Sequence, residues 1–90
     1  MRGYVIYIKV LSYGESGYYR CETVDKISDG LKIRWKFETS TLADAKMWDN
    51  LQEATERYQT LAQDFLECKP MILAVNVKRN GKRDVLYAVL

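Results

Sequence analysis

The stretch Asp49–Lys69, DNLQEATERYQTLAQDFLECK, decides the fold because it is the one segment with the pattern of a long amphipathic helix. Its apolar residues recur at intervals of three and four, which places them on one stripe of a helix. Its polar residues fall on the opposite side, where they can contact water. The apolar stripe consists of Leu51, Ala54, Tyr58, Leu61, Ala62 and Phe65.

The start of this helix can be placed in two ways. Asp49 and Asn50 each have Gln or Glu three residues later, which is the spacing of a capping box and favours a start at this point. Ser40 or Thr41 would then cap a separate short turn. Alternatively, one unbroken helix runs from Thr41 to Glu67. The proline that follows ends the helix in either case, because the residue before a proline disfavours helical dihedral angles.

The segments on both sides of the helix are typical of strands, because they are rich in β-branched and aromatic residues. Ser28-Asp29-Gly30 predicts a turn between the second and third strands. Asn80-Gly81 predicts a two-residue type I′ turn between the fourth and fifth. The predicted strands are Tyr4–Leu11, Tyr18–Ile27, Leu31–Glu38, Met71–Lys78 and Asp84–Leu90.

The loop length sets the register of the first hairpin. A three-residue loop places Arg20 opposite Glu38 and Glu22 opposite Lys36, which gives two cross-strand pairs of opposite charge. A two-residue loop would instead place Glu22 beside Phe37. We therefore expect the three-residue loop.

In the last hairpin, we expect Val75 opposite Leu86, Leu73 opposite Ala88 and Ala74 opposite Tyr87. The resulting fold class is α+β, with the order β-β-β-α-β-β, an antiparallel sheet of about five strands and one long helix packed on one face. Ninety residues fit a single domain, residues 1–90.

The first, fourth and fifth strands carry apolar residues on both faces, whereas one helix covers only one face. Either the segment Leu42–Trp48 reaches the second face, or another chain does. The second alternative predicts a homodimer through a sheet face or a sheet edge. We assign Trp35, Trp48, Tyr58 and Phe65 to the core.

The composition argues against most catalytic chemistry. The chain has no histidine, which removes the commonest general base and the commonest metal ligand. No Gly-rich loop leads from a strand into a helix, so a phosphate cradle is not expected. Four carboxylates at helical spacing are typical of a solvated surface. These carboxylates are those of Asp44, Asp49, Glu53 and Glu56. We therefore predict a protein without enzymatic activity, metal site or cofactor.

The number of cysteines and the net charge indicate a cellular compartment rather than a function. Cys21 and Cys68 are too few for a disulfide scaffold, so we expect two free, buried thiols in a reducing compartment. No apolar run approaches the length of a membrane span, and no signal-peptide pattern is present. These features predict a cytoplasmic protein with no membrane contact, and a net charge of +2 names no partner.

Two groups of cations are candidate binding sites. The first is the tip of the last hairpin, where a cationic β-ribbon could contact phosphates. The second is the outer face of the second and third strands, opposite an acidic helix face. Both groups also fit a role without binding, in which charged side chains at turns and sheet edges keep the protein soluble. The tip consists of Lys78, Arg79, Lys82 and Arg83, and the sheet face of Arg20, Lys32, Arg34 and Lys36.

The middle of the chain contains Ala45-Lys46-Met47-Trp48 followed by Leu51-Gln52-Glu53-Ala54, between a Tyr-rich hairpin and a closing strand pair. In this order of segments, the chain resembles small uncharacterised proteins of phages and mobile elements in Gram-positive bacteria. The resemblance covers roughly the middle half of the chain and concerns packing rather than chemistry. It implies an accessory protein that binds and inhibits a host factor such as a defence nuclease. The alternative function is nucleic-acid binding by the two basic groups, and an enzyme ranks third.

Overall fold

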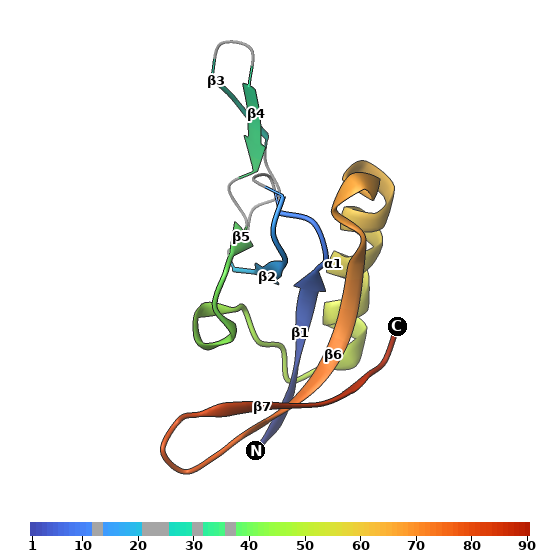
Figure 1. The fold of residues 1–90 in the computed structure, drawn as a ribbon. Coiled ribbons are helices and arrows are strands. Elements are labelled where there is room, and N and C mark those ends of the chain that lie inside the picture. The colour runs from blue at the N-terminus through green and yellow to red at the C-terminus, as the bar shows by residue number, and fades with distance from the viewer. Residues whose placement is uncertain (12–13, 21–25, 30–31, 36–37) are drawn as a thin grey trace.

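The computed structural model describes residues 1–11, 14–20, 26–29, 32–35 and 38–90, and for residues 26–29 and 32–35 it describes the backbone only. The elements appear in chain order in Figure 1. They are β1 (Arg2–Ile8), β2 (Gly17–Tyr19), β3 (Lys26–Asp29), β4 (Lys32–Trp35), β5 (Glu38–Thr39), the 3₁₀ turn η1 (Leu42–Asp44), α1 (Leu51–Asp64), the 3₁₀ turn η2 (Leu66–Cys68), β6 (Pro70–Val77) and β7 (Arg83–Ala88).

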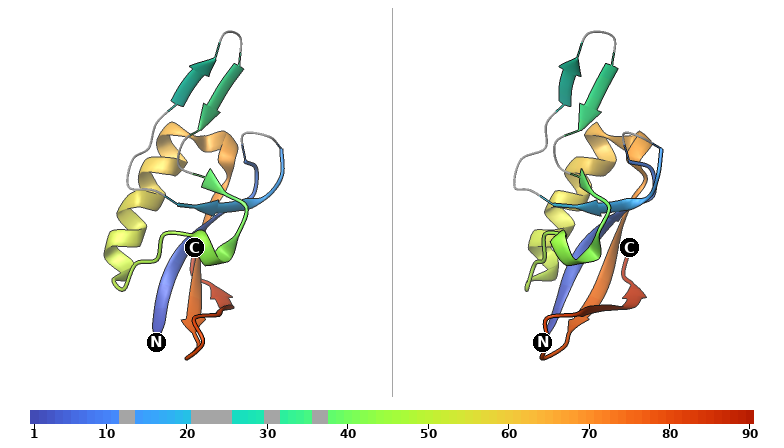
Figure 2. Two further views of the ribbon diagram at one scale, coloured as in Figure 1. Left: turned by 90° about the vertical axis from the view of Figure 1, so that its left-hand side faces the viewer. Right: turned by 60° about the vertical axis from the view of Figure 1, so that its left-hand side comes forward.

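The predicted α+β fold is confirmed. Five antiparallel strands form a sheet in the order β5-β2-β1-β6-β7, and α1 packs on one of its faces (Figure 1). The central pair β1–β6 runs in register over seven residue pairs, from Arg2 opposite Asn76 to Ile8 opposite Pro70. β3 and β4 form a separate two-stranded sheet that projects from one end of the molecule (Figures 1 and 2).

The core between the sheet and α1 is built from alternate residues of the central strands and one stripe of the helix. Trp48 and Phe65 are buried there and Tyr58 packs against its border, as predicted; the side chain of Trp35 lies outside the described part. The buried members are Ile6, Ile8, Leu11, Tyr19, Trp48, Ala54, Leu61, Phe65, Cys68 and Ile72.

The second face of the sheet is covered by the segment between β5 and α1, which is the first of the two alternatives that the sequence left open. Ala45 is buried against Val5, and Leu42 and Met47 pack against the same apolar cluster. Val75 completes this cluster from β6. The chain itself therefore covers both faces of β1 and β6.

The alternative of one helix from Thr41 to Glu67 is wrong. Trp48 forms a bridge to β1, with both of its backbone groups hydrogen-bonded to those of Tyr4 at 2.8 Å. The chain must pass the sheet edge here to move from one face to the other, and an extended segment does this while satisfying its backbone. The helix then begins after Asn50, whose Oδ1 accepts a hydrogen bond from the Gln52 amide at 2.7 Å.

The helix also ends earlier than the predicted Lys69. α1 ends at Asp64, because Phe65 leaves helical geometry and its side chain is buried in the core. A 3₁₀ turn and Lys69, with a left-handed φ of 48°, then lead into β6. In the part of the chain that the structure describes, every helix falls short of the length and apolar character that a membrane crossing requires.

The register predicted for the first hairpin is wrong. Tyr19, not Arg20, pairs with Glu38, and Asp29 pairs with Lys32, whereas the predicted pair Glu22–Lys36 lies outside the described residues. The prediction rested on charge pairs, which contribute about 0.2–1 kcal/mol each. Full burial of a large apolar side chain contributes about 1.5–3 kcal/mol, so the packing of the strands can outweigh such charge pairs.

The turn predicted for the last hairpin is wrong as well. The Lys78 amide donates to the Lys82 carbonyl at 2.8 Å, and the Gly81 amide donates to the Lys78 carbonyl at 2.9 Å. Three residues therefore form the loop, and only Gly81 has a positive φ (86°), whereas a type I′ turn needs two. The side chain of Asn80 stabilises this loop by accepting from the Lys82 amide at 3.0 Å.

A β-bulge follows from the longer loop. Val75 pairs with Val85 rather than with the predicted Leu86, because the register shifts between Ala74 and Val75. Beyond the shift, the pairs Ala74–Tyr87 and Leu73–Ala88 stand as predicted. Leu86 is thus the extra residue of β7.

Candidate interaction surface

The structure does not bring the two predicted basic groups together. Lys32 and Arg34 lie on β4, in the projecting two-stranded sheet, whereas the turn between β6 and β7 lies at the opposite end of the molecule (Figures 1 and 2). The molecule measures 44 Å along its longest axis. Arg20 is exposed just after β2, and Lys36 lies outside the described residues. The predicted basic sheet face depends on side chains outside the described part of the chain and stays a prediction.

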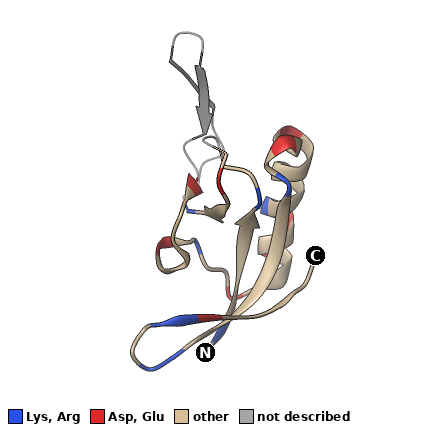
Figure 3. Ribbon diagram, in the orientation of Figure 1, with Lys and Arg blue, Asp and Glu red and all other residues tan. Residues whose placement is uncertain are grey.

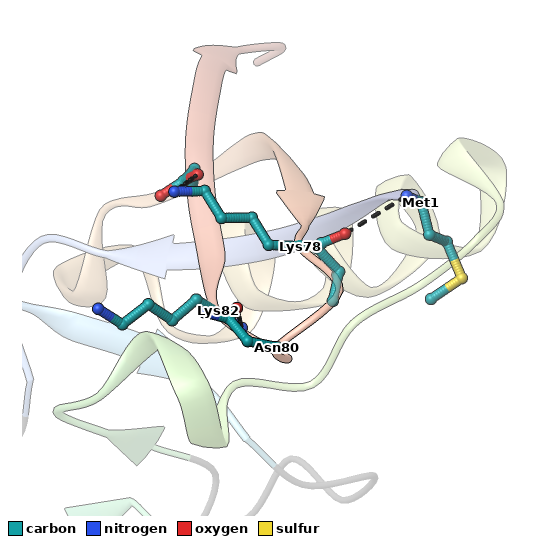
Figure 4. Close-up of polar contacts among 6 residues, drawn as sticks. Met1, Lys78, Asn80 and Lys82 are labelled. Atoms are coloured by element: carbon teal, nitrogen blue, oxygen red, sulfur yellow. Dashed lines mark hydrogen bonds and ion pairs between the residues drawn. The ribbon is translucent and has the colours of Figure 1, made fainter.

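The tip of the last hairpin gathers the other four cations (Figure 3). Lys78 follows β6, Arg79 and Lys82 belong to the turn and its end, and Arg83 opens β7. Figure 4 shows the turn with Met1 beside it, where the Met1 nitrogen donates to the Val77 carbonyl at 3.4 Å. The hairpin tip is thus attached to the start of β1.

Two of these four cations have partners within the protein. The Lys78 ammonium lies 3.1 Å from a carboxylate oxygen of Asp84. Nη1 of Arg83 donates to the carbonyls of Leu42, at 2.9 Å, and Ala45, at 2.7 Å. Arg79 and Lys82 are exposed, and the described residues give neither of them an ion pair. The tip therefore offers two unengaged cations rather than the four that the sequence predicts.

Arg83 is expected to be a structural residue. Arg83→Met keeps much of the side-chain length but leaves the carbonyls of Leu42 and Ala45 without their charged donor, so we expect a loss of about 1–3 kcal/mol in the free energy of unfolding. Urea denaturation measures this loss. Lys82→Met, an exposed neighbour, is the control and should change stability by less than about 0.5 kcal/mol. Equal losses in both variants would show that the carbonyl contacts do not stabilise the fold.

The last strand forms an exposed apolar edge, which we call the β7 edge: Val85, Leu86 and Tyr87. β7 is the final strand in the sheet order, so only one of its sides pairs with a strand of the described sheet. The exposed fractions are 47% for Val85, 41% for Leu86 and 54% for Tyr87. The sequence placed these side chains on apolar sheet faces and suggested pairing through a sheet edge without naming the strand. The strand at the edge could not be named because it depends on the strand order.

Three of the carboxylates considered from the sequence, those of Asp44, Glu53 and Glu56, are exposed. Asp44 accepts a hydrogen bond from the Thr41 hydroxyl at 2.6 Å in an exposed turn. Glu53 and Glu56 line an open hollow of about 460 Å³ together with Trp48. Among the described residues, no group of three or more His, Cys, Asp and Glu side chains is placed to hold a metal ion.

Cys68 is a buried free thiol in the helix-side core, as expected; Cys21 lies outside the described residues. Burial raises the pKa of the Cys68 thiol to about 12, and the charge of Glu67 adds to this effect. Because the thiolate is the reactive form, Cys68 is poorly suited to nucleophilic chemistry near neutral pH.

The raised pKa of Cys68 predicts a pH-dependent stability. Between the ordinary value of 9.0 and about 12, the unfolded thiol loses its proton while the folded thiol keeps it, so rising pH favours the unfolded state. Cys68→Ala should be less stable than the unsubstituted protein at pH 7, since it leaves a cavity. This difference should shrink as the pH rises above 9. Urea denaturation of both proteins at several pH values measures it, and a constant difference would contradict the raised pKa.

Comparison of the chain with protein-family models, curated proteins and solved structures found no match. The β7 edge and the basic tip adjoin each other, because the tip leads directly into β7.

Proposed function

We propose that this protein is a small binding protein that acts through protein–protein contact at the β7 edge. The observation that carries the proposal is an edge strand with three consecutive apolar residues, Val85 to Tyr87, each at least 41% exposed. An edge strand offers unpaired backbone groups, and exposed apolar side chains beside them provide the contact area that a protein partner buries.

The surroundings of the β7 edge support this interpretation. The apolar residues of β1 and β6 are covered on both faces by α1 and by the segment that contains Ala45. The exposed residues of the β7 edge are therefore separate from this covered core. Inhibition of a host factor, which the resemblance to phage and mobile-element proteins implies, would be one activity of such a binding protein.

Site-specific photocrosslinking tests the proposal. A photoreactive phenylalanine analogue at Tyr87 should capture a cellular protein, whereas the same group at Gln59, on the exposed side of α1, should not. The captured protein is then purified and titrated with the unsubstituted chain and with Tyr87→Asp. We expect at least a tenfold loss of affinity for Tyr87→Asp. The same adducts from both positions, or equal affinities, would refute binding at the β7 edge.

Nucleic-acid binding at the basic tip is the second candidate, and the exposed Arg79 and Lys82 favour it. The number of phosphate contacts can be read from a plot of the logarithm of the association constant for duplex DNA against the logarithm of the salt concentration. Two contacts would give a slope of about −1.8, and four would give about −3.6. We expect a slope no steeper than about −2. The measurement is fluorescence anisotropy with labelled single- and double-stranded DNA and RNA.

The matched variants decide whether that binding belongs to the tip. Arg79→Glu combined with Lys82→Glu should abolish it without affecting the fold. Lys9→Glu combined with Lys69→Glu makes the same change in net charge at the far end of β1 and should retain most of it. Loss of binding in both double variants would assign the effect to net charge alone.

A further inference from the structure

We infer that the partner at the β7 edge is an extended peptide segment that adds antiparallel to β7, with apolar residues along its length and carboxylates at its C-terminal end. This inference rests on the proposed function and names the chemistry of the partner. Three features of the described residues carry it: the form of the edge, the placement of charge beside it and the area that it exposes.

The form of the edge fits a short added strand. Val85 pairs with Val75, on the sheet face opposite α1, while Tyr87 pairs with Ala74, two residues further along β7 and past the bulge. The bulge at Leu86 twists the edge and interrupts regular backbone pairing. Pairing with a second copy of β7, which carries the same bulge, is thereby disfavoured, whereas a flexible segment can adjust its backbone to the bulge.

The charge beside the edge selects an acidic end. Residues 85–90 carry no charged side chain, so an apolar segment suits this part of the edge. At the other end of β7, Asp84 is already paired with Lys78, while Arg79 and Lys82 are exposed. In an antiparallel addition, the C-terminal end of the incoming segment lies next to this end of β7. A carboxylate there would meet the two unengaged cations.

The exposed area also favours a segment over a second folded copy. Val85, Leu86 and Tyr87 together expose an apolar area of at most a few hundred Å². A stable interface between two folded proteins buries about 800 Å² on each side. A second copy paired antiparallel would, moreover, place its uncharged residues 85–90 near Arg79 and Lys82 and would bring no carboxylate side chain from β7 to them.

Three end-blocked synthetic peptides test the inference, each about eight residues long with alternating Val and Thr. One carries two Asp at the C-terminal end, one carries two Lys there, and one carries the two Asp at the N-terminal end. Each is titrated into the isotopically labelled protein while NMR records the backbone amide shifts. We expect the first peptide to bind at least tenfold more tightly than either of the others, with the largest shifts at Val85, Leu86 and Tyr87.

Protein variants separate the charge effect from the pairing. Arg79→Glu with Lys82→Glu should remove the preference for the first peptide, while Lys9→Glu with Lys69→Glu, the control with the same net charge, should keep it. Equal affinities for all three peptides, shifts confined to other elements, or failure of every peptide to bind at millimolar concentration would overturn the inference. Concentration-dependent self-association that Tyr87→Asp abolishes would overturn it in favour of a second copy.

The two proposals fail in distinguishable ways. If no peptide binds but the crosslink at position 87 identifies a partner whose affinity depends on Tyr87, the proposed function stands and its partner is not an acidic strand. If the crosslink also fails, the β7 edge is not a binding surface.

Discussion

Leu61→Ala is expected to lower the free energy of unfolding by about 2–5 kcal/mol. Leu61 is fully buried near the end of α1, in the cluster that includes Ile6 and Ile72 of the two central strands. The substitution removes three heavy atoms from the interface between helix and sheet and leaves a cavity that the rigid strand pair β1–β6 cannot fill by relaxing. Urea denaturation followed by circular dichroism measures the change.

Leu66→Ala is the matched control, because it makes the same chemical change on the η2 turn at a side chain that is 71% exposed. We expect it to alter stability by less than about 0.5 kcal/mol. If the two variants were equally unstable, the packing of α1 on the sheet would not be the main source of stability, contrary to the core described above.

Gly17→Ala is expected to lower the free energy of unfolding by about 3 kcal/mol, at the upper end of the range for overpacking. A Cβ atom at Gly17 would overlap the carbonyl oxygen of Thr39 and would lie 2.7 Å from Cδ1 of Leu11. The oxygen belongs to the backbone of β5, which cannot move without disturbing its pairing with β2. Thermal and urea denaturation report the loss of stability, and amide exchange of Tyr18 reports the loss of pairing.

Gly3→Ala is the comparison that isolates the backbone clash. A Cβ atom at Gly3 would lie 2.6 Å from Cγ and 2.7 Å from Sδ of Met47, and 3.1 Å from the Trp48 carbonyl oxygen. Met47 is flexible and partly buried, so its side chain can move aside. Gly3→Ala should therefore be clearly less destabilising than Gly17→Ala, and the reverse order would contradict the packing described for β2 and β5.

The candidate sites could be predicted from the sequence only as residue types. The cations of the last hairpin tip were recognisable because Asn80-Gly81 marks a turn, and turns are exposed. The sequence did not show which of these cations are available to a binding partner. Lys78 is paired with the nearby Asp84, and Arg83 binds carbonyls about forty positions earlier in the chain. The β7 edge was missed for a similar reason, since a strand's place in the sheet depends on long-range pairing.

The sequence by itself determined the features that depend on neighbouring residues: the existence of α1, the strand-forming segments and the α+β order. The periodicity of apolar residues and the local backbone preferences are sufficient for these. Only the tertiary structure decided the helix ends, the strand registers, the bulge at Leu86 and the segment that covers the second sheet face. These features depend on burial of particular side chains, such as Tyr19 and Ala45, against residues distant in the chain. That burial stabilises the fold more than the local turn and charge preferences that it overrides.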